Sequence, residues 1–377
     1  MPPAVRRRPI RLLLVAGARP NFMKIAPLIR GIRRHQREKG RRDIGYRLVH
    51  TGQHYDQNMS EIFFKELRIP APDFNLEVGS GSHAVQTARI MLEFEPVCVQ
   101  ERPDWVVVVG DVNSTMACTL VASKLGFRVA HVEAGLRSYD RTMPEEINRL
   151  VTDALADLLF TPSADANENL IREGISPAKI RLVGNVMIDT LVASLPKVRT
   201  AALAKAGKWR PHRYAYITLH RPSNVDDLKN LERVFRELNS LARRLPVVFP
   251  VHPRTRNMIA QHLSAVGRHP DLSLLEPVGY YDSLWLTQNA SFVLTDSGGL
   301  QEESTYFQTP CLTLRPNTER PVTITEGTNK LTSLSCLAAD IAAILESPPR
   351  KGRIPEFWDG HASDRILEAF LSARNTP

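Results

Sequence analysis

Residues 105–115 read WVVVVGDVNST, a run of four valines that ends in a glycine and a polar segment. The run predicts a β-strand, and the residues after the glycine predict the start of a helix. The aspartate at this turn, Asp111, either caps the helix or presents its carboxylate beyond the end of the strand. Strand, turn and helix in this order form the unit from which parallel sheets with crossover helices are built.

The same unit recurs along both halves of the chain. In the first half the predicted strands are residues 10–16, 46–51, 105–110, 128–132, 158–161 and 180–182. In the second half they are residues 214–219, 247–251, 272–275, 292–295 and 310–314. The alternation predicts two Rossmann-like, doubly wound α/β domains, which bind ligands beyond the carboxyl ends of their strands.

The length of 377 residues also favours two domains, because a single hydrophobic core rarely grows that large. Residues 195–211 are rich in Lys, Arg and Ala, lack a strand pattern and are the predicted linker. We therefore expect an N-terminal domain at residues 1–195 and a C-terminal domain at residues 196–360, facing each other across a cleft. Apolar residues at helical spacing near the C-terminus predict a helix within residues 361–377 that packs back on the first domain.

The composition excludes several classes of protein. Hydrophobic residues at 43% and charged residues at 24% are ordinary globular values, which exclude disorder as the main state. No apolar run approaches the ~18–20 residues that span a membrane. The four cysteines lie far apart without a zinc spacing, so we expect a reducing, cytoplasmic compartment and no metal.

The net charge of +9 raises the question of a nucleic-acid partner. Much of the excess lies in two arginine-rich segments, residues 6–8 and 30–42, which are typical of a solvated surface. No nucleic-acid-binding motif accompanies these segments, so we expect no nucleic-acid partner.

Three further segments of the first half place charged residues just after predicted strands. Residues 17–24 read GARPNFMK, where a glycine turn opens a helix whose N-terminus, with Arg19 and Lys24, suits an anion. Residues 131–138 read HVEAGLRS and place Glu133 at a strand end. Residues 143–149 read MPEEINR, in which Glu145 and Glu146 follow a proline as at many helix starts. For the first segment a plain strand-to-helix turn with two surface cations remains open, and for the third an ordinary helix start remains open.

The second half repeats this arrangement. Residues 218–222 (TLHRP) and 251–254 (VHPR) place His220 and His252 after strands, although a lone histidine is more often structural. Residues 295–303 read TDSGGLQEE, where two glycines let backbone amides approach phosphates and Glu303 can accept both hydroxyls of a ribose. Residues 314–321 read LRPNTERP and supply two arginines, the residue best suited to bidentate phosphate contacts.

The order and spacing of these segments resemble those of the UDP-N-acetylglucosamine 2-epimerase family, in its non-hydrolysing branch, from residue 17 to about residue 331. The resemblance implies a GT-B-like pair of domains, usually a homodimer, that binds a UDP-sugar without a metal or other cofactor. It implies that the catalytic residues are Asp111, Glu133, Glu145 and His220. It also implies that the substrate-binding residues are Arg19, Lys24, Arg149, His252, Ser297, Gly298, Gly299, Glu303 and Arg320.

The chemistry of such an epimerase agrees with this set of residues. The hydrogen on C2 of the sugar is not next to a carbonyl, so its direct removal would leave a poorly stabilised carbanion. Departure of UDP first places positive charge at C1 and makes that hydrogen acidic, and its removal gives 2-acetamidoglucal. Return of a proton from the other face requires two acid–base groups, and the sequence does not assign them among the three carboxylates.

Some positions depart from the commonest bacterial pattern of the family. Asn21 stands where Glu is frequent, and Ala18 where Thr is frequent. Residues 51–59, TGQHYDQNM, form a longer loop that keeps Gln53 but leaves allosteric activation by a second UDP-sugar in doubt. Ser283 falls where an aromatic residue often stacks on uracil, a role that Tyr280 or Tyr281 could fill instead.

Four rival functions remain open at this level. The nearest is epimerisation of a related substrate, a UDP-2,3-diacetamido-uronic acid, which would need an additional cation near C6. A GT-B glycosyltransferase would share the fold and the diphosphate site, but the three carboxylates at strand ends argue against it. A hydrolysing epimerase would release free N-acetylmannosamine, and a non-catalytic sugar-nucleotide sensor would not need the carboxylates.

Overall fold

The computed structural model describes residues 8–38, 40, 43–53, 67–263, 266–346 and 352–373, without the side chains of residues 19, 205 and 206. Contacts between Cα atoms divide the chain into two compact units. Unit 1 comprises Met1–Thr190 and Glu356–Pro377, and unit 2 comprises Leu191–Pro355. The predicted boundary after residue 195 falls inside a helix, α7 (Val186–Val198). Most of the TGQHYDQNM loop, residues 54–59, lies outside the described residues.

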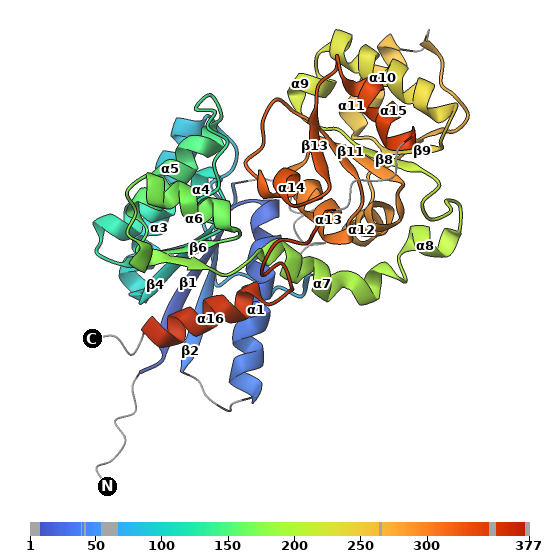
Figure 1. The fold of residues 1–377 in the computed structure, drawn as a ribbon. Coiled ribbons are helices and arrows are strands. Elements are labelled where there is room, and N and C mark those ends of the chain that lie inside the picture. Colours follow the sequence, from blue (N-terminus) through green and yellow to red (C-terminus); the bar gives the residue numbers. More distant parts are fainter. Residues whose placement is uncertain are drawn as a thin grey trace. The chain divides into compact units, whose positions relative to one another are not determined.

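Unit 1 contains a parallel sheet in the order β3-β2-β1-β4-β5-β6-β7 (Figure 1). The strands are β1 (Ile10–Ala16), β2 (Ile44–His50), β3 (Phe74–Asn75), β4 (Trp105–Val109), β5 (Arg128–Val132), β6 (Leu158–Thr161) and β7 (Ile180–Leu182). The helices, besides α7 and a short 3-10 helix at Pro177–Lys179, are α1 (Arg19–Glu38), α3 (His83–Glu101), α4 (Asn113–Lys124), α5 (Pro144–Leu155), α6 (Ala164–Arg172) and α16 (Ala362–Ala373).

Both faces of this sheet are covered, which explains the continuous valine run of β4. On one face Val106 and Val108 belong to a buried cluster that also includes residues of α3 and α4. On the other face Trp105 meets the ring of Phe370, from α16, with centroids 5.6 Å apart. Strands buried on both faces have no need for polar residues, so they read as apolar runs rather than as an alternating pattern.

The C-terminal tail belongs to unit 1. Helix α16 packs against α1, and the Asp189 carboxylate accepts hydrogen bonds from the first backbone amides of α16, at 3.0 Å from Ala362 and 2.7 Å from Ser363. Just before this helix, the buried indole of Trp358 donates to the carbonyl oxygen of Pro162 at 2.9 Å. A carboxylate at a helix N-terminus satisfies amides that have no partner within the helix.

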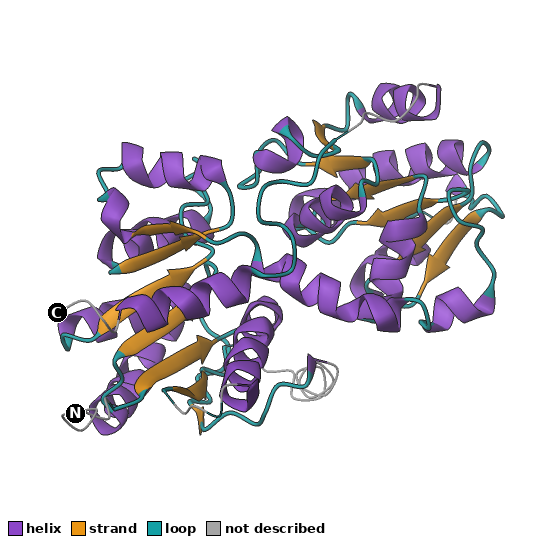
Figure 2. Cartoon of the chain, turned by 60° about the horizontal axis from the view of Figure 1, so that its bottom comes forward, coloured by secondary structure: helices purple, strands orange, loops and turns teal. Residues whose placement is uncertain are grey.

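Unit 2 contains a second parallel sheet, in the order β10-β9-β8-β11-β12-β13, and Figure 2 shows helices beside the strands of each unit. Its strands are β8 (Ala215–Thr218), β9 (Val247–Pro250), β10 (Leu272–Leu275), β11 (Phe292–Thr295), β12 (Cys311–Leu314) and β13 (Asn329–Thr332). Its helices are α8 (Ala202–Ala206), α9 (Pro222–Val225), α10 (Leu228–Ala242), α11 (Pro253–His262), α12 (Tyr280–Asn289), α13 (Gly298–Phe307), α14 (Val322–Thr325) and α15 (Leu337–Glu346).

The predicted fold class, two doubly wound α/β domains, is confirmed. The strands that the sequence does not reveal are β3 and β13. The first is only two residues long, and the second reads NKLT, a polar composition at the edge of the sheet. The predicted linker is partly helical, and its Trp209 is buried in a hydrophobic cluster of unit 2.

We predict that Gly184→Ala destabilises unit 1 strongly. Gly184 has a φ of +89°, and a Cβ there would lie 2.0 Å from the carbonyl oxygen of Phe357 in the tail. We expect a loss of about 3 kcal/mol in the free energy of unfolding, because backbone strain and an unavoidable clash add. Urea unfolding of the full chain measures the loss.

Gly174→Ala is the matched control for this substitution. Its φ is +83°, but a Cβ there would meet nothing within 4 Å. It should therefore cost only about 1 kcal/mol, from backbone strain alone. Equal losses for the two variants would contradict the tight contact between the tail and the end of β7.

Candidate functional site

The carboxyl ends of β1, β4 and β5 lie at one edge of the sheet of unit 1, because β4 pairs in parallel with both neighbours. The residues that follow these strands are Gly17, Gly110 with Asp111, and Glu133. Two of the predicted catalytic carboxylates therefore lie at neighbouring strand ends. This edge is also where the strand order reverses, the usual ligand site of doubly wound sheets.

Glu133 is buried and paired with a cation. Its Oε2 forms an ion pair with Nζ of Lys24, from the second turn of α1, and the two side chains are only 4% and 7% exposed. Glu133 also has a φ of 74°, a left-handed conformation that non-glycine residues rarely adopt and that is often found at functional sites. The structure thus pairs Lys24, which was predicted to hold the nucleotide, with Glu133, which was predicted to act on the sugar.

Gly110 makes this ion pair possible. Its φ is +67°, and a Cβ there would lie 2.6 Å from Nζ of Lys24 and 3.4 Å from Oε2 of Glu133. Any side chain would occupy the place of the ammonium group. Gly110 is therefore needed both for the conformation of the turn and to leave space for the ion pair beside it.

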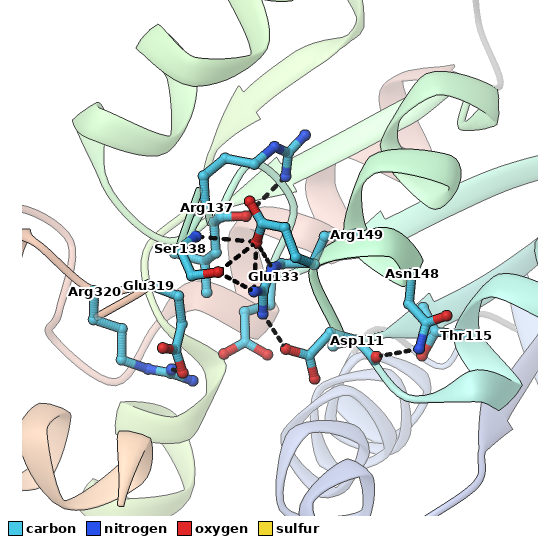
Figure 3. A network of polar contacts seen from close by, with 12 residues as sticks. Asp111, Thr115, Glu133, Arg137, Ser138, Asn148, Arg149, Glu319 and Arg320 are labelled. Carbon is cyan, nitrogen blue, oxygen red and sulfur yellow. Dashed lines mark hydrogen bonds and ion pairs between the residues drawn. The ribbon is translucent and has the colours of Figure 1, made fainter. Parts of the chain in front are cut away.

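Asp111 is oriented by Arg149, as Figure 3 shows. Nη1 of Arg149 lies 2.5 Å from Oδ2 of Asp111, and Nη2 lies 2.6 Å from Oε2 of Glu146. The backbone carbonyl of Asp111 accepts a hydrogen bond from Nδ2 of Asn148 at 2.9 Å. The Asp111 side chain keeps 29% of its surface exposed, whereas that of Arg149 is 2% exposed. Arg149 is thus placed to position Asp111.

The two adjacent glutamates at the start of α5 differ in surroundings. Glu146 is buried and accepts hydrogen bonds from the amides of Ser138 and Tyr139 at 3.0 and 2.9 Å. Burial alone would raise the pKa of Glu146, but these amides and Arg149 outweigh burial and hold it below its usual value. Glu145 is exposed and forms no ion pair with any residue that the structure describes. Glu146 is therefore the structural member of the pair, and Glu145 the accessible one.

A buried histidine that the sequence did not single out supports the same edge. His131 is fully buried in β5, with Nδ1 2.6 Å from Oδ1 of Asp153 and Nε2 2.8 Å from the carbonyl oxygen of Gly110. Burial would raise the pKa of Asp153, but His131 and Arg137 outweigh burial and keep it low. Both ring nitrogens thus lie beside oxygen atoms, so His131 connects Asp153 with the turn that contains Gly110.

Asn21 holds the turn after β1. Its Oδ1 accepts from the amides of Gly17 and Ala18 at 3.0 and 2.9 Å, and its Nδ2 donates to the carbonyl of Val109 at 2.9 Å. An amide supplies both the acceptor and the donor, which the frequent Glu of the family cannot do when ionised. Gln53 is likewise used internally, because its Oε1 accepts from Oγ of Ser114 at 2.7 Å.

In unit 2, His220 follows β8 and is held by a buried aspartate. Its Nδ1 lies 2.8 Å from Oδ1 of Asp296, which is fully buried, while the His220 side chain is 60% exposed. Asp296 also accepts from the backbone amides of His220 and Arg221 and from Asn224. Burial would raise the pKa of Asp296, but these contacts, led by His220, hold it low. The sequence segment TDSGG contained Asp296, yet only the fold connects it with His220.

The N-terminus of α13 is packed against an arginine. A Cβ on Gly298 would lie 2.6 Å from Nη1 of Arg320, so this glycine makes room for the guanidinium. A Cβ on Gly299 would meet only Oγ of Ser297, at 4.0 Å, and Ser297 forms no side-chain cap. The helix start thus presents its amides beside a positive charge, an arrangement suited to phosphate.

Arg320 is held by two buried carboxylates. Its Nε donates to Oε1 of Glu302 at 2.6 Å, and its Nη1 is paired with Glu319. Glu319 also accepts from Nη2 of Arg315 at 2.9 Å. Burial would raise the pKa of Glu319, but Arg320 and Arg315 outweigh burial and hold it well below its usual range. Among Arg320 and these partners, only Arg320 was predicted from the sequence to bind the substrate.

Glu303, in unit 2, is a buried carboxyl group whose pKa is raised. Burial, together with the neighbouring Glu302, raises the pKa of Glu303 to about 8. Its Oε2 has no hydrogen-bond partner among the described residues. A buried carboxyl with an unsatisfied oxygen is costly, and the hydroxyls of a ligand would satisfy it.

The remaining predicted residues are His252 and Arg19, with Tyr280 and Tyr281 as candidates to stack on uracil. His252 is exposed and caps α11, with its Nδ1 accepting from the amide of Arg254 at 3.3 Å. The side chain of Arg19 lies outside the described residues. Tyr281, at the start of α12, receives a hydrogen bond from Nζ of Lys197 at 2.8 Å, and Tyr280 precedes it.

Among the described helices, none combines the length and the apolar character that crossing a membrane requires. Across the same described residues, no group of three or more His, Cys, Asp or Glu side chains is placed to hold a metal ion.

Two doubly wound parallel sheets, each with polar groups beyond its carboxyl edge, define the GT-B-like class of α/β enzymes. A crystal structure of the UDP-GlcNAc 2-epimerase of Methanocaldococcus jannaschii, in complex with UDP-GlcNAc and UDP, superposes with a TM-score of 0.85 at 39% identity. The match covers 96% of this chain and 100% of that chain.

The sequence comparisons name the family. A family model described as UDP-N-acetylglucosamine 2-epimerase matches residues 36–371. A UDP-N-acetylglucosamine 2-epimerase of M. jannaschii is 42% identical over 330 residues, 85% of this chain and 88% of that protein. A UDP-2,3-diacetamido-2,3-dideoxy-D-glucuronate 2-epimerase of Pseudomonas aeruginosa is 42% identical over 365 residues, 95% and 99% of the two chains. The chain belongs to the UDP-N-acetylglucosamine 2-epimerase family and is an isomerase.

We predict that His131 acts on catalysis through its contact with Gly110. In His131→Gln the side-chain amide reaches the position of Nε2 and can still donate to Gly110, whereas in His131→Asn it reaches only the position of Nδ1, near Asp153. The Gln variant should keep kcat within about tenfold, and the Asn variant should lose about 100-fold in kcat with little change in KM. Steady-state kinetics of both variants measure the difference, and equal kcat values would assign His131 a purely structural role.

We predict that Glu303→Gln stabilises the ligand-free protein at alkaline pH. An unfolded chain releases the Glu303 proton near the ordinary pKa of 4.5, whereas the folded chain holds it to about 8. The contribution of this proton to the free energy of unfolding is therefore fully present below pH 4.5. It is lost as the pH rises to about 8. The variant and the wild type should have similar thermal midpoints at low pH, with the variant higher above pH 8. Glu346→Gln, at an exposed position of unit 2, is the control, and a gap independent of pH would refute the prediction.

Proposed function

We propose that this enzyme interconverts UDP-N-acetylglucosamine and UDP-N-acetylmannosamine by eliminating UDP and adding it back. The observation that carries the proposal is the placement of Asp111 and Glu133 at neighbouring strand ends, the first ion-paired with Arg149 and the second with Lys24. Family membership and the UDP-GlcNAc complex of the similar M. jannaschii enzyme support the choice of substrate.

The UDP moiety is assigned to unit 2. The amides at the start of α13, Oγ of Ser297 and the guanidinium of Arg320 supply hydrogen-bond donors and positive charge for the diphosphate. The carboxyl group of Glu303 accepts the hydroxyls of the ribose, which satisfies its buried oxygen. These groups stabilise UDP as a leaving group because they act on the charge that its phosphate gains when the C1–O bond breaks.

The sugar is assigned to the carboxylates of unit 1. As the C1–O bond breaks, its electron pair leaves with UDP, and one carboxylate removes the C2 proton. The electrons of the C2–H bond then form the C1=C2 double bond of 2-acetamidoglucal. Proton delivery to the opposite face of C2 and attack of UDP on C1 reverse both steps with inverted configuration.

The surroundings of each carboxylate suggest different roles within this set. Asp111 is held in one orientation by Arg149 yet remains partly exposed, as a group that transfers protons requires. Glu145 is accessible, whereas Glu133 is buried against Lys24 and suits electrostatic stabilisation of positive charge at C1. His220, whose Nδ1 is held by Asp296, presents Nε2 for contact with the leaving phosphate.

The setting of the enzyme follows from the family alone. We propose that it works as a homodimer in the cytoplasm, without cofactor, and that its product supplies the biosynthesis of a cell-surface polysaccharide.

A second candidate substrate is a UDP-2,3-diacetamido-uronic acid. The Pseudomonas relative, which is named for that epimerisation, is as similar to this chain as the M. jannaschii relative.

We predict that UDP-N-acetylglucosamine exchanges its C2 hydrogen for deuterium when it is incubated with the enzyme in D2O, as measured by NMR. Exchange of the diacetamido-uronic substrate alone would move the assignment to the second candidate. Release of UDP only after addition of an acceptor alcohol would indicate a glycosyltransferase, and release of free N-acetylmannosamine would indicate a hydrolysing enzyme. Binding of UDP-sugars without any exchange would indicate a sensor.

Three substitutions connect the exchange with particular residues. Asp111→Asn, Glu133→Gln and Glu145→Gln should each slow C2 exchange by at least about 100-fold, because each removes an acid–base or charge-stabilising group. The affinity for UDP, measured by calorimetry, should change little. Glu368→Gln, at an exposed position of α16, is the control and should exchange at the wild-type rate. Wild-type exchange in all three variants would refute the proposed site.

A further inference from the structure

Two side-chain amides are buried inside unit 2. Gln301 lies in the first turn of α13 and Asn329 begins β13, and both residues are 0% exposed. Nδ2 of Asn329 donates a hydrogen bond to Oε1 of Gln301 at 3.2 Å. A buried amide costs free energy unless its donors and acceptors are satisfied, and apolar side chains would fill the same space without that cost. The bonds that these amides make to other residues therefore indicate their role.

The two amides hold the backbone of Arg320 on both sides. The amide of Arg320 donates to Oγ1 of Thr318 at 3.1 Å, and this hydroxyl donates to Oε1 of Gln301 at 2.7 Å. Nδ2 of Asn329 donates to Oγ1 of Thr323 at 3.1 Å, and that hydroxyl donates to the carbonyl oxygen of Arg320 at 2.8 Å. The five residues thus close a ring of hydrogen bonds, which we call the polar ring.

The polar ring is attached to the rest of unit 2 at both amides. Nε2 of Gln301 donates to the carbonyl oxygen of Ser297, directly before α13, at 3.3 Å. Oδ1 of Asn329 accepts from Oγ1 of Thr313, in β12, at 2.7 Å. Gln301 therefore connects the turn at the start of α13 with the loop that carries Arg320. These are the two segments to which the diphosphate is assigned.

The polar ring leaves Arg320 little freedom. Each threonine of the ring accepts one hydrogen bond and donates one, so neither hydroxyl can rotate without losing a partner. The guanidinium is held separately, because its Nε donates to Oε1 of Glu302 at 2.6 Å. Backbone and side chain of Arg320 are therefore both fixed before a ligand arrives, which is how a binding group is preorganised.

We propose that Gln301 and Asn329 are positioning residues for the diphosphate, because through the two threonines they hold Arg320 at a fixed place beside the start of α13. The inference rests on the proposed assignment of the diphosphate to Arg320 and adds the residues that set its position. It also explains why β13, a strand of the sheet, begins with a polar residue. Loss of the polar ring should weaken binding of the diphosphate but not that of the nucleoside.

Two substitutions of Thr318 test the polar ring. Thr318→Val keeps the branched shape but removes both hydrogen bonds of the hydroxyl, so it should weaken UDP binding about tenfold in calorimetry. Thr318→Ser keeps the hydroxyl and should bind UDP within about threefold of the wild type. Uridine, which lacks the diphosphate, should bind both variants as it binds the wild type, measured by NMR titration. An equal loss for uridine and UDP would indicate a general loosening of unit 2 and would overturn the inference.

Gln301→Met tests the centre of the polar ring. It removes the donor and the acceptor at similar side-chain length and should weaken UDP binding about 30-fold. Gln288→Met, at an exposed position of α12, is the matched control and should bind UDP with wild-type affinity. Circular dichroism shows that each variant is folded. Lower thermal stability of Gln301→Met with wild-type affinity for UDP would assign Gln301 a purely structural role and overturn the inference.

A double-mutant cycle shows whether the effect passes through Arg320. Arg320→Ala should weaken UDP binding about 100-fold, and adding Thr318→Val should then change the affinity little further. Additive losses would overturn the inference, because Thr318 would act independently of Arg320. Wild-type affinity of Arg320→Ala would overturn the assignment of the diphosphate and the inference with it. C2 exchange by the wild type tests the reaction independently of these affinities.

Discussion

Parallel pairing of β4 with β1 and β5 is the constraint on which the site of unit 1 depends. Backbone hydrogen bonds between these strands fix their register, so that their carboxyl ends come to the same edge of the sheet. Residues far apart in sequence, such as Lys24 and Glu133, then lie in contact. A shift in register would separate these charges and leave each buried alone, which is far more costly than the pair.

Several buried carboxylates in both units have partners that hold them in place. Arg149 joins Asp111 to Glu146, His131 joins Asp153 to the turn before Asp111, and in unit 2 Asp296 holds His220. Such networks contribute little net stability, but they hold side chains in one orientation. For a reaction that passes protons to two faces of one carbon atom, this fixed geometry matters more than stability.

Glu303 shows the opposite arrangement. Its carboxyl is buried with one oxygen unsatisfied among the described residues, and its neighbour Glu302 is also acidic, so the ligand-free protein holds this group at a cost in stability. A ribose with two adjacent hydroxyls would relieve that cost. If a nucleotide binds there as proposed, the stability that Glu303 costs would be recovered as binding affinity.

The sequence by itself determined the fold class, most of the strands and the segments that carry the site, because apolar runs followed by glycine turns define where each strand ends. Without the family resemblance it could not tell Glu145 from Glu146, since both stand in the first turn of one helix and only packing against Ser138 and Arg149 buries the second. It also did not reveal His131 and Asp296 as supports for the site. The partners of these residues lie on other strands and helices, so only the tertiary structure, which brings distant segments together, decides what they do.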